Sequence, residues 1–332
     1  MDIQNTKEIK AAAGRRLTDA QQAKRVVVVY AAVTLGLSAL VTLLGLALDG
    51  MMAQSTGLSG MGRRTVLSSA QTVLPWVVAL ITMCVELGYQ AAMLRVARGQ
   101  YTSPRTLRLG FDRFWVLLRY TLLEGLILFG IAFAGIYLAT MLFMFTPFSE
   151  KAVDLVAPLM ENVTLLNPEM VIDDTLYAQL MQAMIPAFVL CAIVIGAVAI
   201  PVMYRLRMGR FVLIDKPGIG AMAALRESWK MMKGNCTKLL KLDVSLWWYY
   251  AGGILATLLC YGDVLLPMTG VNFPWSDTVS YYLFFVLYLA AQFAVYYFLR
   301  NPAETSYAIA YDSIRPKEPK TEGAVLGNIF QM

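Results

Sequence analysis

Glu86, Tyr89 and Gln90 are the residues whose types and spacing best suit chemistry inside an apolar stretch of this sequence. Side chains three and four positions apart share one face of a helix, so these three would form one polar patch. Glu86 precedes Arg95 by about 13 Å of helix at about 1.5 Å per residue, which is mid-membrane depth if the stretch spans a bilayer. An ionisable group there could bind a cation or proton, or line the path of an amphipathic substrate. It could equally hydrogen-bond a neighbouring helix.

Other polar residues in the apolar stretches have simpler interpretations. Gln292 joins the candidate polar site as a neutral group, and its expected role is hydrogen bonding between helices. Glu124 follows Arg119 by about 7 Å of helix, and we expect it to pair with an arginine of a neighbouring helix near the inner boundary. Arg95 and Arg119 complete the predicted group of structural ion-pairing residues. The same ordinary pairing is expected for two aspartates beside basic residues at inner helix ends, Asp215 and Asp243.

Several common chemistries have no residues to carry them. The sequence contains no histidine, and its four cysteines form no CxxC pair: Cys84, Cys191, Cys236 and Cys260. Histidine and clustered cysteines supply most transition-metal sites and disulfide frameworks. Phosphate-binding, dinucleotide-binding, nucleophile-elbow and metalloprotease motifs do not occur either. We therefore expect no metal, no cofactor, no catalytic residue and no enzymatic activity.

The composition belongs to a membrane protein. Apolar residues make up 58% of the 332 residues, charged residues 15%, and the mean hydropathy is +0.59, whereas soluble domains carry about a quarter charged residues. Six apolar runs are long enough to cross a hydrocarbon core about 30 Å thick, near 26–48, 70–94, 119–145, 180–204, 244–266 and 279–299. Closed barrels show short alternating segments instead, so the predicted fold is an all-α polytopic bundle of six spans. The first run is too long for a signal-peptide core and is interpreted as retained.

The distribution of basic residues predicts the orientation. Alternate segments, beginning with the amino-terminal one, hold 25 of the 28 lysines and arginines, and the others hold only Arg63, Arg64 and Lys151. Cytoplasmic segments carry such an excess, so both ends are expected in the cytoplasm. The domains are then a cytoplasmic segment 1–25, a membrane domain 26–300 and a cytoplasmic tail 301–332. Because the basic residues mark membrane boundaries, the expected partner is the lipid bilayer and not nucleic acid; a protein partner or a homo-oligomer stays open.

Two basic connections have the pattern of amphipathic helices at the inner membrane surface. In 103–115 the apolar positions are Leu107, Phe111 and Phe114, and in 217–233 they are Met222, Leu225, Trp229 and Met232. Each connection links an inward to an outward span, which suggests a loose internal duplication of 84–145 and 191–266. The alternative is that basic linkers commonly become interfacial helices. The only sizeable outer connection, 146–179, is acidic and could bind a partner or simply cover the bundle.

The second half of the chain resembles a family of bacterial integral membrane proteins catalogued as domain of unknown function number 975. The resemblance rests on these features: Tyr204-Arg205, Asp215-x-Pro217, Ser228, Met231 to Gly234, Leu242 to Trp248, YGDVLLPMTGV at 261–271 and SYAIAYDSI at 306–314. It covers roughly 85–314 and is weaker before Arg205, where many relatives carry a Pro-Gly-Ile turn and this chain has IPVMYRL around Pro201. It implies a multi-pass protein of the bacterial plasma membrane and no particular activity.

Two classes of function follow from these observations. The first is a small permease, exporter or lipid-handling protein, with Glu86 and Gln90 lining the route. The second is a non-catalytic scaffold, or a protein that protects against membrane-active peptides through partner or lipid contacts. A permease should place Glu86, Gln90 and Gln292 around a hydrated cavity near the midplane, whereas a scaffold should be a tightly packed bundle with an exposed apolar groove or an oligomer seam.

Overall fold

The computed structural model describes residues 5–54, 57–162, 174–268 and 276–316, and every regular element in these ranges is a helix. The longer helices are α1 Thr6–Asp19, α2 Gln21–Ala53, α3 Gly57–Ala97, α5 Phe114–Met144, α6 Pro147–Asn162, α7 Asp174–Leu206, α11 Trp247–Cys260, α13 Asp277–Ala294 and α14 Asn301–Ile314. The shorter ones are η1 Pro104–Arg108, α4 Leu109–Asp112, α8 Gly209–Asp215, α9 Ala221–Met231, α10 Cys236–Ser245, α12 Gly262–Met268 and the π-helical turn η2 Val295–Arg300.

Five of the described helical segments are long and apolar enough to cross a membrane, which confirms an all-α membrane protein. They are Gln21–Ala53, Gly62–Ala97, Phe114–Met144, Met181–Asp215 and Val279–Ile314. The predicted span at 244–266 is divided among α10, α11 and α12. The 14 residues of α11 extend only about 21 Å at about 1.5 Å per residue, less than the hydrocarbon thickness of about 30 Å. The count of six spans therefore stays a prediction.

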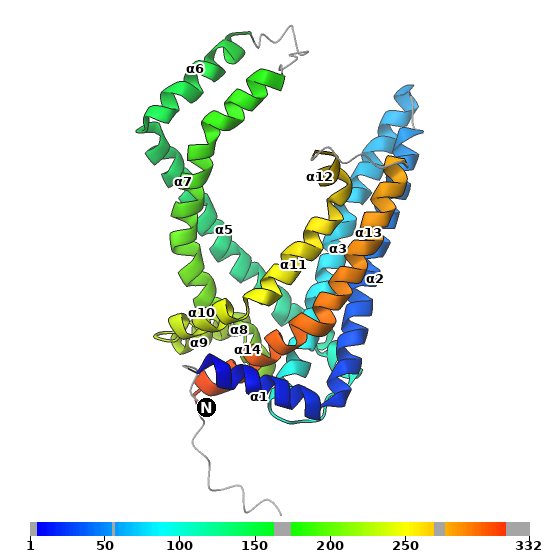
Figure 1. Ribbon diagram of the computed structural model, residues 1–332, viewed down its shortest axis with the longest axis vertical. Coiled ribbons are helices and arrows are strands. Elements are labelled where there is room, and N and C mark those ends of the chain that lie inside the picture. The colour runs from blue at the N-terminus through cyan, green and yellow to red at the C-terminus, as the bar shows by residue number, and fades with distance from the viewer. Residues whose placement is uncertain (1–4, 55–56, 163–173, 269–275, 317–332) are drawn as a thin grey trace, which may run out of the picture.

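The helices form two arms that diverge from a common base (Figure 1). One arm contains α5, α6 and α7, and the other contains α2, α3, α11, α12 and α13. The base is built from α1, α8, α9, α10 and α14 together with the adjoining ends of the long helices. The largest buried apolar cluster lies in this base and joins α1, α8, α9, α10 and α14.

The base contains residues that the sequence analysis assigned to a tail. The last apolar helix does not end at Arg300: it continues through η2 into α14, and residues 305–311 of α14 are buried. Within α14, Ala303, Ala308 and Ala310 are fully buried against the basal cluster. The chain therefore continues as a packed helix beyond the predicted boundary at 300, up to Ile314.

The two predicted amphipathic connections differ in structure. Residues 217–233 contain α9, whose inward face buries Leu225 and whose outward face exposes Met222 and Trp229. Residues 103–115 form η1 and α4, and they pack into the bundle instead of forming one surface helix. Gly88 of α3 lies against the backbone of Leu107, and Gly110 lies against the backbone of Cys84. A side chain at either glycine would prevent this close approach. Of the predicted outer segment and tail, residues 163–173 and 317–332 lie outside the described residues.

Candidate functional site

A cavity of about 900 Å³ lies where the two arms meet the base. The wall on one arm comes from α5 and α7, and the opposite wall comes from α10 and α11. Its polar lining residues are Gln90, Glu124, Tyr204, Arg207, Arg210, Asp243 and Tyr250. Its apolar lining residues are Leu128, Ile200, Met203, Leu240, Val244, Trp247, Ala251 and Ile254. The cavity therefore combines two guanidinium groups and two carboxylates with a wall of aliphatic and indole side chains.

Asp243 is the most highly coordinated polar residue in the cavity. Its carboxylate accepts hydrogen bonds from the hydroxyls of Tyr204 at 2.5 Å and Tyr307 at 2.6 Å, and it forms an ion pair with Arg207. Arg207 also donates to the hydroxyl of Tyr250 and lies over the ring of Tyr307, 4.3 Å from its centroid. These contacts join α7, α10, α11 and α14, so Asp243 fixes the floor of the cavity and holds Arg207 in place.

Glu124 and Arg210 form a looser pair across the cavity. Glu124 lies on α5 and Arg210 on α8, with carboxylate oxygen and guanidinium nitrogen 3.8 Å apart. Gln90 lies nearby on α3; its Nε2 is 3.4 Å from Glu86, and its buried Oε1 has no hydrogen-bond partner among the described residues. An incoming polar group could satisfy that amide oxygen, because an amide carbonyl accepts up to two hydrogen bonds.

Glu86 lies beside the cavity in a separate buried ion cluster and does not contribute to the cavity lining. It accepts a hydrogen bond from the hydroxyl of Tyr30 at 2.6 Å and pairs with Arg300. Arg300 lies within 5.0 to 5.4 Å of the ring centroids of three tyrosines, Tyr30, Tyr89 and Tyr296. Such cation–π contacts stabilise a desolvated guanidinium. The π-helical turn η2 ends at Arg300. The Nε atom of Arg300 is 3.9 Å from Oε1 of Glu304, which follows four residues later.

The remaining predicted site residues make different contacts. Tyr89 stacks on Tyr30 with ring centroids 4.3 Å apart, and its hydroxyl is buried without a hydrogen-bond partner among the described residues. Gln292 does not line the cavity, and its amide oxygen is also buried without such a partner. Arg95 donates to Thr106 at 3.2 Å. Arg119 lies on a different side of α5 from Glu124, so the expected arginine partner of Glu124 is Arg210 of α8.

A family model described as "Protein of unknown function (DUF975)" matches residues 1–318. The chain belongs to this family. Searches of curated proteins and of solved structures returned no match. The matched range extends the resemblance at 85–314 to include α1, whose Ile9 and Ala13 are buried in the basal cluster.

The segments that carried the family resemblance meet in the base. Tyr204 and Tyr307 both bond Asp243, and Tyr311 donates to Asp215 at 3.1 Å. Four residues of these networks were not among the predicted site residues: Arg207, Arg210, Arg300 and Tyr307. These residues could have been found because they lie in or near the segments that resemble the family. Spacing along the chain does not show that α7, α10 and α14 meet.

Proposed function

We propose that this protein binds an amphipathic molecule with a zwitterionic head in the cavity and that it acts as a lipid-handling membrane protein. One observation carries the proposal: the cavity of about 900 Å³ combines charged side chains of both signs with an apolar wall. Binding cavities for small molecules are mostly apolar with a few polar groups that orient the ligand. The proposal contains no catalytic step.

The charges of the cavity favour a head that carries both signs. Arg207 and Arg210 face the same space as Glu124 and Asp243. A head with a single charge would leave an unbalanced ion in a site of low polarity, which is costly. A phosphate and an ammonium group on one head would each find an oppositely charged side chain. Arg210 and Glu124 are the better candidates for rearrangement, since their 3.8 Å separation is longer than a direct hydrogen bond.

The wall of the cavity suits an acyl chain. Leu128 and Ile254 stand on helices of different arms, α5 and α11, and these helices diverge from the base (Figure 1). Trp247 also lines the cavity and is 67% exposed. Each 100 Å² of apolar surface removed from water contributes about 2.5 kcal/mol, so the wall supplies a substantial part of the affinity for a lipid-like ligand.

The proposed location is the plasma membrane of a bacterium, with the base in the cytoplasm. The segments predicted to be cytoplasmic hold most of the lysines and arginines, and positive charge marks the cytoplasmic side. The cavity would then open near the inner leaflet. A pure scaffold was expected to be tightly packed, so the cavity favours ligand handling, although Glu86 and Gln292 do not line it.

The test is binding of a phosphatidylethanolamine with a fluorescent acyl chain to the purified protein in a neutral detergent. Leu128→Trp fills the cavity and should weaken binding by about tenfold or more, because the probe loses apolar contact area. Phe129→Trp is the matched control, since Phe129 is the next residue on α5, is 68% exposed and does not line the cavity. Equal affinities for the wild type and Leu128→Trp would contradict the proposal, as would an equal loss in the control.

A further inference from the structure

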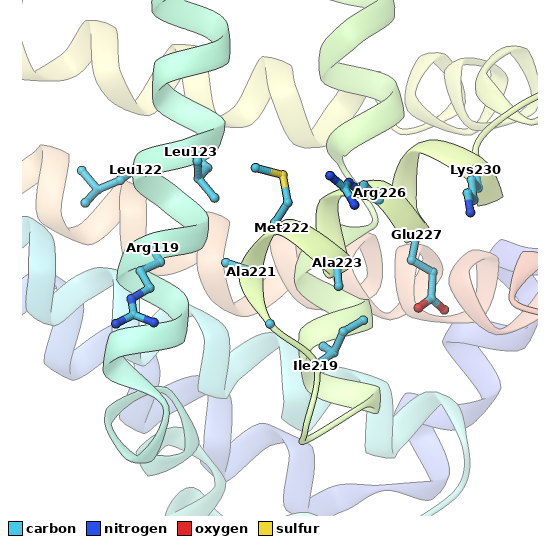
Figure 2. A pocket seen from close by; sticks show the side chains of 11 residues that line it. Arg119, Leu122, Leu123, Ile219, Ala221, Met222, Ala223, Arg226, Glu227 and Lys230 are labelled. Atoms are coloured by element: carbon cyan, nitrogen blue, oxygen red, sulfur yellow. The ribbon is translucent and has the colours of Figure 1, made fainter.

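A second hollow, separate from the cavity, lies between the first turns of α5 and the helix α9. Its volume is about 950 Å³. Figure 2 shows Leu123 of α5 and Met222 of α9 pointing into the space between the two helices, with Arg119 on α5 and Arg226 on α9. We call this hollow the basal groove; its lining includes Arg119, Leu122, Leu123, Met222, Arg226 and Lys230.

The charge of the basal groove is positive. Arg119, Arg226 and Lys230 are exposed, and none of them has an ion-pair or hydrogen-bond partner within the described part of the chain. The acidic residue of the lining, Glu227, is already paired with Lys216 at 2.7 Å. Three cations therefore face the groove without a carboxylate of the described ranges to balance them.

The basal groove has charged residues at one end and apolar residues further along α5, which is the order of head and acyl chain in a membrane lipid. Leu122 and Leu123 follow Arg119 by one turn along α5, toward the apolar middle of that helix. Met222 is 48% exposed on the facing side. Each of the two helices also has an exposed tryptophan near these residues in sequence, Trp115 on α5 and Trp229 on α9. Tryptophan is enriched where a protein meets the headgroup layer. Arg119 would then lie at the level of the lipid headgroups, and the apolar surface of Leu122 and Leu123 would begin one helical turn deeper in the membrane.

The position of α9 is fixed by its other face. Ala224, Leu225 and Met231 are buried in the basal cluster, and the hydroxyl of Ser228 donates to the carbonyl oxygen of Arg205 at 2.7 Å. The backbone of α9, from which its outward residues project, is therefore held in place before a ligand arrives. A preorganised site loses less entropy on binding than a flexible one.

We propose that the basal groove binds an anionic phospholipid of the leaflet on the side of the base. Arg119, Arg226 and Lys230 contact the phosphate and the anionic head, and the start of one acyl chain lies against Leu122 and Met222. Basic side chains at an anionic membrane surface each contribute about a fivefold gain in affinity. Three of them, held around one groove, select an anionic lipid over a zwitterionic one.

The test measures binding of phosphatidylglycerol and phosphatidylcholine to the full-length protein in a neutral detergent, by native mass spectrometry. The wild type should retain phosphatidylglycerol with at least about a tenfold preference, given three basic contacts. The triple variant Arg119→Gln, Arg226→Gln, Lys230→Gln should lose that preference. The matched control removes three exposed basic residues outside the groove, Arg105→Gln, Lys233→Gln and Lys241→Gln, and should retain it.

Each alternative result overturns the proposal. Equal retention of the two lipids by the wild type would show that the groove does not select anionic heads. An equal loss in the triple variant and its control would show that only total charge matters. Displacement of phosphatidylglycerol by millimolar inorganic phosphate would assign the site to a soluble anion, and competition by an acidic peptide would assign it to a protein partner. The triple variant should bind the phosphatidylethanolamine probe as tightly as the wild type, because the basal groove and the cavity share no lining residue. A loss of probe binding in the triple variant would overturn the assignment of a separate site.

Discussion

The guanidinium of Arg300 forms an ion pair with the carboxylate of Glu86, a residue 214 positions earlier in the chain. The pair joins α3 to the π-helical turn at the end of the last apolar helix. The Arg300 and Glu86 side chains are only 12% and 16% exposed. Glu86 is thus satisfied by the protein itself, which makes it a structural anchor of the site and not the residue that a ligand reaches first.

The first prediction concerns this ion pair. Arg300→Met leaves a buried carboxylate without its cation and should lower the free energy of unfolding by about 3–5 kcal/mol. Adding Glu86→Gln removes the stranded charge, so the double variant should recover most of that loss. The measurement is reversible unfolding by SDS in mixed micelles. A double variant no more stable than Arg300→Met would contradict a direct interaction between the two side chains.

The second prediction concerns the floor of the cavity. Tyr307 donates to Asp243 and shares a 2.9 Å hydrogen bond with Tyr250. Tyr307→Phe removes both contacts from a buried network and should cost about 1–3 kcal/mol of stability. Tyr250→Phe should cost less, because Tyr250 is 40% exposed and water can replace part of what is lost. Equal costs for the two variants, measured by the same unfolding experiment, would argue against Asp243 as the centre of the network.

The third prediction concerns the close approach of α3 to the connection that follows it. A Cβ at Gly110 would overlap the backbone of Cys84, so Gly110→Ala should lower the stability by about 1–3 kcal/mol or more. Gly130→Ala is the control, since Gly130 lies on α5 with nothing near its missing side chain, and alanine favours helix. The readout is the fraction of monodisperse protein after heating, followed by size-exclusion chromatography. Similar melting of both variants would show that α4 can move away from α3.

The sequence was sufficient for the long apolar helices because span length and hydropathy are local properties. It did not locate the helix breaks at Leu246 and Tyr261, which divide one apolar run into α10, α11 and α12. Both breaks fall inside the run 244–266, where the neighbouring residues are mostly apolar, so hydropathy does not mark them. The tail boundary at Arg300 was drawn because basic residues normally flank a membrane span, whereas this arginine is enclosed by tyrosine rings.

The candidate site was predictable only in part for a related reason. Glu86 stands out in an apolar run, but its partner Arg300 lies on a helix far along the chain. Asp243 was expected to pair with basic residues near it, and it does pair with Arg207, but its two hydroxyl donors come from α7 and α14. The sequence shows which buried polar side chains need hydrogen-bond or ion-pair partners. Which residues become those partners depends on how helices that are distant in the chain pack together.

The fourth prediction concerns the base, where Arg98 bridges Asp215 and Asp312 at 2.7 Å each. Hydrogen bonding to Asp312 raises the pKa of Arg98 above its usual range, in spite of burial that acts in the opposite direction. Arg98 therefore stays charged at any pH at which the protein is folded. Arg98→Gln should cost about 1–2 kcal/mol, allowing for partial exposure, and should speed hydrogen exchange in α14. Arg108→Gln removes an exposed pair with Asp112 and should leave that exchange unchanged.

The fifth prediction concerns the proposed orientation. In a chain with its four cysteines replaced by alanine or serine, single cysteines at Lys230 and Glu150 place one thiol in the base and one on α6 of an arm. If the base is cytoplasmic, an impermeant maleimide added to intact cells should label the cysteine at position 150 and not that at 230. Permeabilised cells should label both, which controls for reactivity. The opposite pattern in intact cells would invert the orientation, and it would move both the cavity and the basal groove to the outer leaflet.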